Sequence, residues 1–203
     1  MELSKVTMIL RGYNVEQVRT VAEVLLHAKH VRNMEITLNT DNAYEIIRII
    51  SDEFQGKLNV GAGTVQTYDE LKKAVDAGAK FVLSPRQMTA DMLAYCKERG
   101  IVSVPGSFTP SEIGDQFVMG ADIVKVFPAN ELSLKYAKKV CEPMGDLKLM
   151  AVGGINRENV REALDSGYKY VGTAGGLFPK DQILQMDKEK MLISLQEFEA
   201  ELD

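Results

Sequence analysis

Eight short apolar runs, separated by amphipathic stretches, constrain the fold of this chain more than any other feature of its sequence. Most of the runs are rich in Val and Ile and lack polar alternation, which is typical of strands that are buried on both faces. In chain order they are Val6–Leu10, Met34–Leu38, Leu58–Ala62, Phe81–Leu83, Ile101–Val104, Ile123–Phe127, Leu147–Val152 and Tyr168–Gly172. Such runs predict the parallel strands of an α/β protein.

The stretches between the runs carry helix signals. Val15–Lys29 places its apolar residues on one stripe, and Asp69–Gly78 and Ala90–Gly100 both end at glycine, which favours a helix C-cap. Thr109–Glu112 forms a capping box with proline at the first helical position. Eight strand–helix units in 203 residues, without a linker, predict a (β/α)₈ TIM barrel that spans residues 1–203 as a single domain.

A doubly wound open sheet is the alternative architecture. Its first turn would more often carry the glycine-rich pattern that binds a dinucleotide, whereas the turn Leu10–Asn14 holds one glycine. The barrel is therefore the favoured fold. In such a barrel the chemistry lies where the strands end and the βα loops begin, so functional residues are expected at those junctions.

Composition and charge narrow the expected partners. The net charge is −5 and no basic stripe alternates with aromatic residues, so we do not expect the chain to bind nucleic acid. No apolar run approaches the roughly 18 residues of a membrane span, and the N-terminus lacks a signal-peptide pattern, so we expect a cytoplasmic protein. Cys96 and Cys141 have neither CxxC spacing nor a nearby histidine, which favours free thiols. We expect neither a metal nor a cofactor.

Two charged residues interrupt the apolar strands. Lys125 has two apolar residues on each side, and Glu35 is likewise flanked by apolar residues. A buried ammonium is costly unless it is paired or loses its proton, and a barrel lysine with a lowered pKa is a nucleophile toward carbonyls. If Glu35 faces the lumen, it would lie beside Lys125 and act as an acid–base group. The alternatives are a lysine that reaches solvent and a structural ion pair.

Arginine and glycine stand at other strand ends. Arg11 closes the first strand, where its planar fork suits a carboxylate or a phosphate, with a surface role as the alternative. Glycines follow three further strands, at Gly61–Val65, Val152–Ile155 and Gly172–Gly176, and Thr64 adds a hydroxyl. The last two loops could hold a phosphate with backbone N–H groups, as such loops often do in barrels, although plain tight turns also use glycine.

Taken in order, these motifs resemble those of a known family, the 2-keto-3-deoxy-6-phosphogluconate / 4-hydroxy-2-oxoglutarate aldolases. The motifs are Glu35–Thr37, Gly61–Val65, Ser84–Pro85, Pro105–Gly106, Val124–Ala129 and Gly153–Ile155. The resemblance extends from about Val6 to Phe178, and the ordered set is far more specific than any one motif. It implies a metal-independent class I aldolase on a (β/α)₈ barrel, commonly a homotrimer.

The resemblance also implies roles for individual residues. Lys125 would form a Schiff base with the substrate, and Glu35 would be the general acid/base. Thr64 would help to hold the substrate carboxylate. Pro85 and Phe127 would line the pocket around the carbons of the keto acid.

Three positions depart from the family pattern. Many members have an arginine four residues after the glutamate, where this chain has Asn39, and Arg11 matches members that use an arginine at the end of the first strand. Val152 stands where threonine is usual and Gly175 where serine is usual, so the phosphate cup lacks two hydroxyl groups. Each lost hydrogen bond to a charged group costs about 1.5–3 kcal/mol. Three outcomes are open: the cup binds phosphate weakly, it binds phosphate through backbone N–H groups helped by Thr173, or it accepts a substrate without phosphate. The residues expected to form this cup are Gly153, Gly154, Thr173 and Gly175.

The expected reaction is cleavage of a 2-keto-4-hydroxy acid into pyruvate and an aldehyde, such as glyceraldehyde 3-phosphate or glyoxylate, through a lysine Schiff base. A phosphosugar isomerase or a phosphate-binding synthase is a second hypothesis, because it would use the same glycine loops without a nucleophilic lysine. A third is a catalytically silent barrel that binds a metabolite. Two costly charges within apolar strands speak against the silent barrel.

Overall fold

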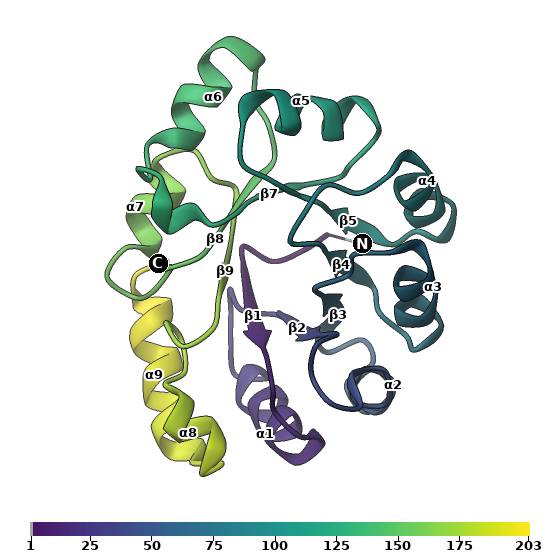
Figure 1. The fold of residues 1–203 in the computed structure, drawn as a ribbon. Coiled ribbons are helices and arrows are strands. Elements are labelled where there is room, and N and C mark those ends of the chain that lie inside the picture. Colours follow the sequence, from purple (N-terminus) through teal and green to yellow (C-terminus); the bar gives the residue numbers. More distant parts are fainter. Residues whose placement is uncertain (1) are drawn as a thin grey trace.

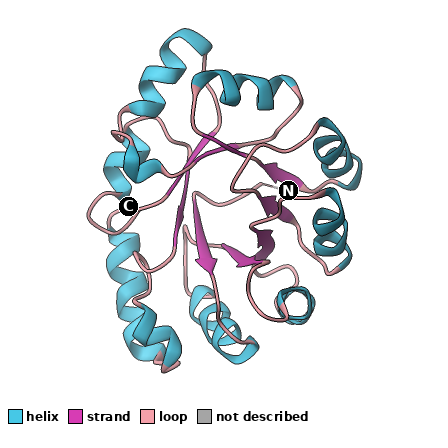
Figure 2. Cartoon of the chain, viewed as in Figure 1, coloured by secondary structure: helices cyan, strands magenta, loops and turns pink. Residues whose placement is uncertain are grey.

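The chain forms a nearly closed barrel of parallel strands with helices around the outside (Figure 1, Figure 2). The computed structural model describes residues 2–203. Within these residues, nine strands form one sheet in the order β5-β4-β3-β2-β1-β9-β8-β7-β6, and each neighbouring pair is parallel. The predicted barrel architecture is confirmed.

The strands and helices have the following bounds. The strands are β1 Val6–Leu10, β2 Asn33–Thr37, β3 Asn59–Gly63, β4 Phe81–Leu83, β5 Val102–Val104, β6 Gly106–Ser107, β7 Val124–Val126, β8 Leu149–Val152 and β9 Tyr170–Thr173. The helices are α1 Val15–Leu25, α2 Ala43–Glu53, α3 Tyr68–Asp76, α4 Ala90–Arg99, α5 Pro110–Val118, η1 Ala129–Glu131 (a short 3₁₀ helix), α6 Tyr136–Met144, α7 Val160–Asp165, α8 Lys180–Leu184 and α9 Lys188–Ala200.

The ninth strand arises because the predicted fifth strand continues past a break. β5 pairs with β4, whereas β6 pairs with β7. Pro105 lies between them, and proline has no N–H group to donate to a strand ladder. Its carbonyl accepts a hydrogen bond from the Lys125 N–H at 2.8 Å. The segment 102–107 therefore supplies both edge strands of the sheet, β5 and β6. Because these two strands follow one another in the chain, the two edges lie next to each other and the barrel is nearly closed.

Alternate residues along each strand face two different cores. The larger core lies between the strands and the surrounding helices, and in β2 it receives Met34 and Ile36. A second cluster fills the barrel interior, called the lumen below, and comprises Leu3, Ile9, Phe81, Leu83, Val104, Ile123, Met150 and Val152. Side chains alternate between the faces of a strand, so this pattern shows which residues point inward.

Side-chain caps begin several helices at the expected places. Thr109 and Glu112 form the predicted capping box of α5, and Asn14 and Gln17 form another at the start of α1. The prediction that the first helix extends to Lys29 is wrong, because α1 ends at Leu25. Beyond that point the next N–H groups donate to carbonyls three residues back, which tightens the final turn and ends the α-helical pattern.

The C-terminal helix α9 is tied to the start of the barrel by a buried carboxylate. Glu199 is 7% exposed and accepts hydrogen bonds from the backbone N–H groups of Lys29 and His30, at 2.8 and 2.6 Å. It also accepts from the N–H of Val31 at 3.3 Å. These bonds fix the turn that leads from α1 into β2, the strand that carries Glu35.

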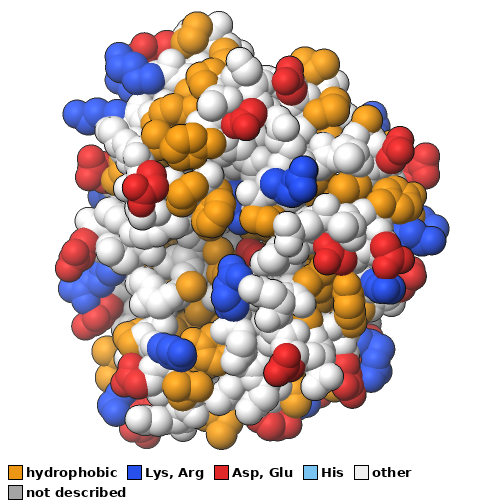
Figure 3. Space-filling model, in the orientation of Figure 1, with side chains coloured by type: hydrophobic (Ala, Val, Ile, Leu, Met, Phe, Trp, Pro, Cys, Tyr) orange, Lys and Arg blue, Asp and Glu red, His pale blue; other side chains and the backbone are white. Residues whose placement is uncertain are grey.

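The surface mixes charges of both signs. Figure 3 shows acidic and basic side chains interspersed over one face, with a hydrophobic group over α5 and α6. No helix among residues 2–203 is long and apolar enough to cross a membrane. Over the same residues, no group of three or more His, Cys, Asp or Glu side chains is arranged to hold a metal ion.

Candidate active site

Lys125 points into the lumen from the middle of β7. Its neighbours Val124 and Val126 pack in the outer core, whereas Ile123 belongs to the lumen cluster, so the two-residue period turns Lys125 inward. The residue is only 6% exposed, and its Nζ lies 4.5 Å from the centroid of the Phe127 ring. Burial lowers the pKa of Lys125, Glu35 opposes that shift, and the positive charge of Arg11 adds to it.

Glu35 points into the same lumen from β2. It is 2% exposed, and its Oε2 has no hydrogen-bond partner in the described chain, residues 2–203. Burial raises the pKa of Glu35 above 4.5, while Lys125 and Arg11 act to lower it. A carboxyl group that is buried without partners holds its proton more easily than an exposed one, as an acid–base group near neutral pH requires.

Space for the Glu35 carboxylate comes from Gly63, at the end of β3. A Cβ atom at that position would overlap the Glu35 carboxylate. The motif Gly61–Val65 indicates only a glycine-rich strand end, and the role of Gly63 beside Glu35 is not predicted from the sequence. The signal that could have found it is the register, because Gly61 and Glu35 are aligned across β3 and β2 and Gly63 continues the same inward face.

Lys125 and Glu35 act on each other electrostatically but do not form a close ion pair. The ion pairs of residues 2–203, with N and O within 4.0 Å, include neither residue. The structural ion pair that the sequence left open is therefore not formed.

A cavity of about 580 Å³ opens at the ends of β1, β8 and β9. It brings together five of the residues expected to bind substrate: Arg11, Gly153, Gly154, Thr173 and Gly175. Arg11 is exposed and lines this cavity, and its charge acts on both Glu35 and Lys125. We call this cavity the distal cup.

The glycines of the distal cup are required by close packing as well as by backbone shape. Gly153 and Gly154 have φ values of +113° and +71°, and a Cβ atom on either would lie within 2.8 Å of Asn130. Gly175 differs, because a Cβ atom there would meet nothing within 4 Å. The side-chain position at Gly175 therefore opens into free space.

The one hydroxyl group of the distal cup is already engaged. Thr173 is 2% exposed, and its Oγ1 donates to the carbonyl of Ile155 at 2.6 Å. The hydroxyl proton of Thr173 is therefore not available to a bound ligand. Val152, in the lumen cluster, presents only methyl groups. Backbone N–H groups, Arg11 and the side-chain amide of Asn156 are then the donor groups around this cup.

The other expected residues do not line the distal cup. Thr64 follows Gly63 with φ +60°, a strained conformation for a β-branched residue that is typical of functional loops. Pro85 packs against Gly106, which pairs with Lys125. Phe127 is 37% exposed and covers the Lys125 ammonium. Asn39 is exposed and follows the end of β2.

Comparison with known proteins gives a consistent result. The model of the family "KDPG and KHG aldolase" matches residues 1–193. The 2-dehydro-3-deoxy-phosphogluconate aldolase of Dickeya dadantii is 34% identical over 82% of this chain and 78% of its own length. The KHG/KDPG aldolase of Escherichia coli is 33% identical, with the same coverage of both chains.

A solved structure agrees with these relatives. The KDPG aldolase from Legionella pneumophila, with pyruvate captured as a covalent carbinolamine, superposes with a TM-score of 0.83 at 27% identity and covers 97% of this chain and 93% of its own. The aldolase hypothesis is thus supported over the isomerase or synthase. Since the family model spans nearly the whole sequence, this chain is an aldolase that belongs to the KDPG and KHG aldolase family.

Proposed function

We propose that this aldolase cleaves a 2-keto-4-hydroxy acid into pyruvate and an aldehyde, with Lys125 as the Schiff-base nucleophile and Glu35 as the general acid/base. The observation that carries the assignment is that the buried amine of Lys125 faces the same lumen as the unpaired carboxyl group of Glu35. Burial lowers the pKa of this amine. A lowered pKa raises the neutral, nucleophilic fraction of the amine at neutral pH.

The reaction runs in balanced steps. The neutral amine of Lys125 attacks the C2 ketone, and the carbinolamine loses water to give an iminium. Glu35, directly or through a water molecule, takes the proton of the C4 hydroxyl, the C3–C4 bond breaks, and its electron pair moves to the iminium to form an enamine. The aldehyde departs; protonation at C3 and hydrolysis then release pyruvate and free Lys125. The iminium is the electron sink, so this sequence needs no metal.

The remaining residues bind the substrate in this proposal. Thr64 and Arg11 hold the carboxylate, and Pro85 and Phe127 border the carbon chain next to Lys125. Gly153, Gly154, Thr173 and Gly175 surround the far end of the substrate in the distal cup. A glyceraldehyde 3-phosphate or glyoxylate half would occupy that cup. Because the Thr173 hydroxyl is engaged, backbone N–H groups and the Asn156 amide would bind it.

Trapping tests the nucleophile directly. Incubation with pyruvate and a borohydride reagent should add the mass of the reduced pyruvate adduct to the peptide that holds Lys125, measured by mass spectrometry. Lys125→Ala should show no adduct and lose at least about 10³-fold in kcat. Lys148, an exposed lysine, provides the matched control, and Lys148→Ala should behave as the wild type. Full activity of Lys125→Ala would contradict the assignment.

We also propose a cytoplasmic homotrimer. The exposed apolar side chains over α5 and α6, among them Val118 and Met144, suit a contact between subunits (Figure 3). The free cysteines Cys96 and Cys141 suit a reducing compartment. Light scattering should give about three times the chain mass of 22.5 kDa, and Val118→Glu should reduce it if this surface forms the contact. A wild type of single-chain mass would contradict the trimer.

A further inference from the structure

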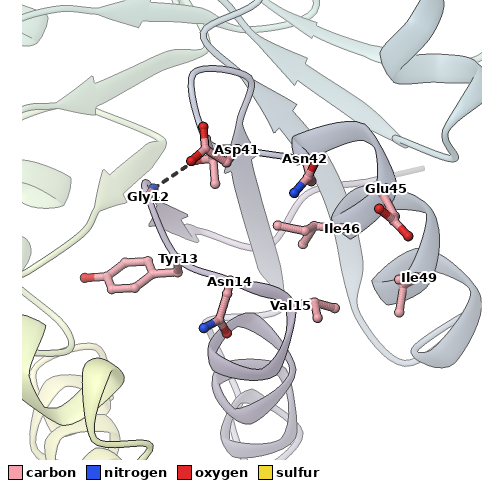
Figure 4. Close-up of a pocket in the computed structure, with 10 residues that line it drawn as sticks. Gly12, Tyr13, Asn14, Val15, Asp41, Asn42, Glu45, Ile46 and Ile49 are labelled. Atoms are coloured by element: carbon pink, nitrogen blue, oxygen red, sulfur yellow. Dashed lines mark hydrogen bonds between the residues drawn. The ribbon is translucent and has the colours of Figure 1, made fainter.

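A chain of hydrogen bonds joins the loop after β1 to the end of β2 (Figure 4). The N–H of Gly12 donates to Thr40 Oγ1 at 2.9 Å, which is the dashed line in Figure 4, and Thr40 Oγ1 lies 3.1 Å from Thr37 Oγ1. Thr40 is 7% exposed and Thr37 is fully buried. We call these three residues, Gly12, Thr37 and Thr40, the threonine strap.

The threonine strap connects strand β1, which Arg11 directly follows, to strand β2, which carries Glu35 at its centre. Gly12 directly follows Arg11, and Thr37 lies two residues after Glu35, on the same inward face of β2. Gly12 has φ +75°, and a Cβ atom there would meet nothing within 4 Å. The space beside Gly12 is therefore open, and the hydrogen bond from its N–H to Thr40 ties the turn after β1 to the end of β2.

We propose that Thr40 is a positioning residue of this aldolase, which acts through Gly12 to hold the Arg11 guanidinium between the distal cup and the lumen. This inference rests on the proposed function, because it takes Arg11 as a substrate-binding residue and Glu35 and Lys125 as the reacting pair. Thr40 itself lines a separate pocket of about 330 Å³, with Tyr13 and Ile46, and not the distal cup.

Electrostatics provides a readout that is specific to this role. The charged groups that shift the pKa of the lumen pair are few: Arg11 lowers the pKa of both Glu35 and Lys125, and those two residues act on each other. Asp41 and Glu45 line the pocket beside Thr40 but are not among these groups. If Arg11 moves away from the lumen, the pKa of Glu35 and the pKa of Lys125 should both rise.

The test compares Thr40→Val, which removes the acceptor and keeps the shape, with Thr40→Ser, which keeps the hydroxyl. Thr40→Val should lower kcat/KM by about 10-fold to 100-fold, since a misplacement on the order of 1 Å costs ~100-fold. Its pH profile of kcat/KM should move to higher pH, and Thr40→Ser should restore both. Thr20→Val is the matched control, because Thr20 is also 7% exposed and, among residues 2–203, its hydroxyl donates only to the Glu16 carbonyl, at 2.8 Å.

An Arg11→Ala background shows whether Thr40 acts through Arg11. There, Thr40→Val should cause no further shift of the pH profile. A Thr40→Val enzyme with an unmoved profile, or a Thr40→Ser enzyme as impaired as Thr40→Val, would overturn the inference while leaving Lys125 and Glu35 in place. An Arg11→Ala enzyme with wild-type kinetics would instead contradict the proposed role of Arg11. If Thr40→Val does not fold, Thr40→Ala is measured in its place with the same expected shift.

Discussion

The Glu35 carboxylate occupies the space that a side chain at Gly63 would fill. The two residues lie on neighbouring strands, with the register of β2 and β3 bringing Thr37 beside Gly63 and Glu35 beside Gly61. A glycine in a strand costs stability, so its presence here reflects the close approach of another group. That group is the carboxyl group that we propose as the general acid/base.

Gly63→Ala should therefore displace Glu35 and reduce catalysis. We expect kcat/KM to fall by about 100-fold, and the free energy of unfolding to fall by roughly 1–3 kcal/mol from overpacking. Steady-state kinetics and denaturant unfolding measure the two effects. Gly175→Ala is the control for stability, because its added methyl group meets open space. Equal activity of Gly63→Ala and wild type would show that Glu35 does not need its present position.

Glu35→Gln should make the protein more stable relative to wild type as the pH rises. The folded pKa of Glu35 is raised above 4.5, so its contribution to stability is fully present below 4.5 and is lost as the pH rises through the folded pKa. Glutamine has no such loss, so the gap between the two proteins should widen over that window. Urea midpoints from pH 4 to 9 measure it, with the exposed Glu98→Gln as control. A gap that is constant with pH would contradict the raised pKa.

The rate at which Lys125 forms its Schiff base should depend on pH with a midpoint below 10.5. Burial lowers the pKa of Lys125, and the Glu35 carboxylate opposes that shift. In Glu35→Gln the midpoint should therefore move further down. Single-turnover trapping of pyruvate with cyanoborohydride, followed by mass spectrometry, measures the midpoint. An upward move in Glu35→Gln would contradict the electrostatic coupling of the pair.

Gly175→Ser should increase the preference of the enzyme for a phosphorylated substrate. The position has free space and no left-handed backbone, so a serine hydroxyl can be added to the distal cup without strain. A new hydrogen bond to a charged group contributes about 1.5 kcal/mol or more, equivalent to ~10-fold in the ratio of kcat/KM for phosphorylated over non-phosphorylated keto acids.

A coupled assay of pyruvate release measures that ratio. Gly153→Ser is the comparison, because Gly153 has φ +113° and lies against Asn130, and this variant should lose activity toward both substrates. An unchanged ratio in Gly175→Ser would show that the distal cup does not hold the phosphate.

Glu199→Ala should destabilise the fold without disabling Lys125. It would leave the partly buried N–H groups of Lys29 and His30 and the buried N–H group of Val31 without their acceptor, at a cost of about 2–4 kcal/mol. At roughly 2–4 °C per kcal/mol for a chain of this size, Tm should fall by about 4–16 °C. Glu197→Ala, which breaks only an exposed ion pair with Arg157, should change Tm little. Similar losses in both variants would contradict a special role for Glu199.

The sequence by itself determined the alternating units of the barrel and the presence of two charged residues, Glu35 and Lys125, within its apolar strands. Apolar runs and capping boxes are local signals, and the two-residue period of a strand tells which neighbours share a face but not which face is the lumen. Only the tertiary structure decided which groups meet across strands. The space at Gly63, the bond of Thr173 to Ile155 and the strap from Thr40 to Gly12 depend on register and loop packing between segments distant in the chain, and no local period encodes these contacts.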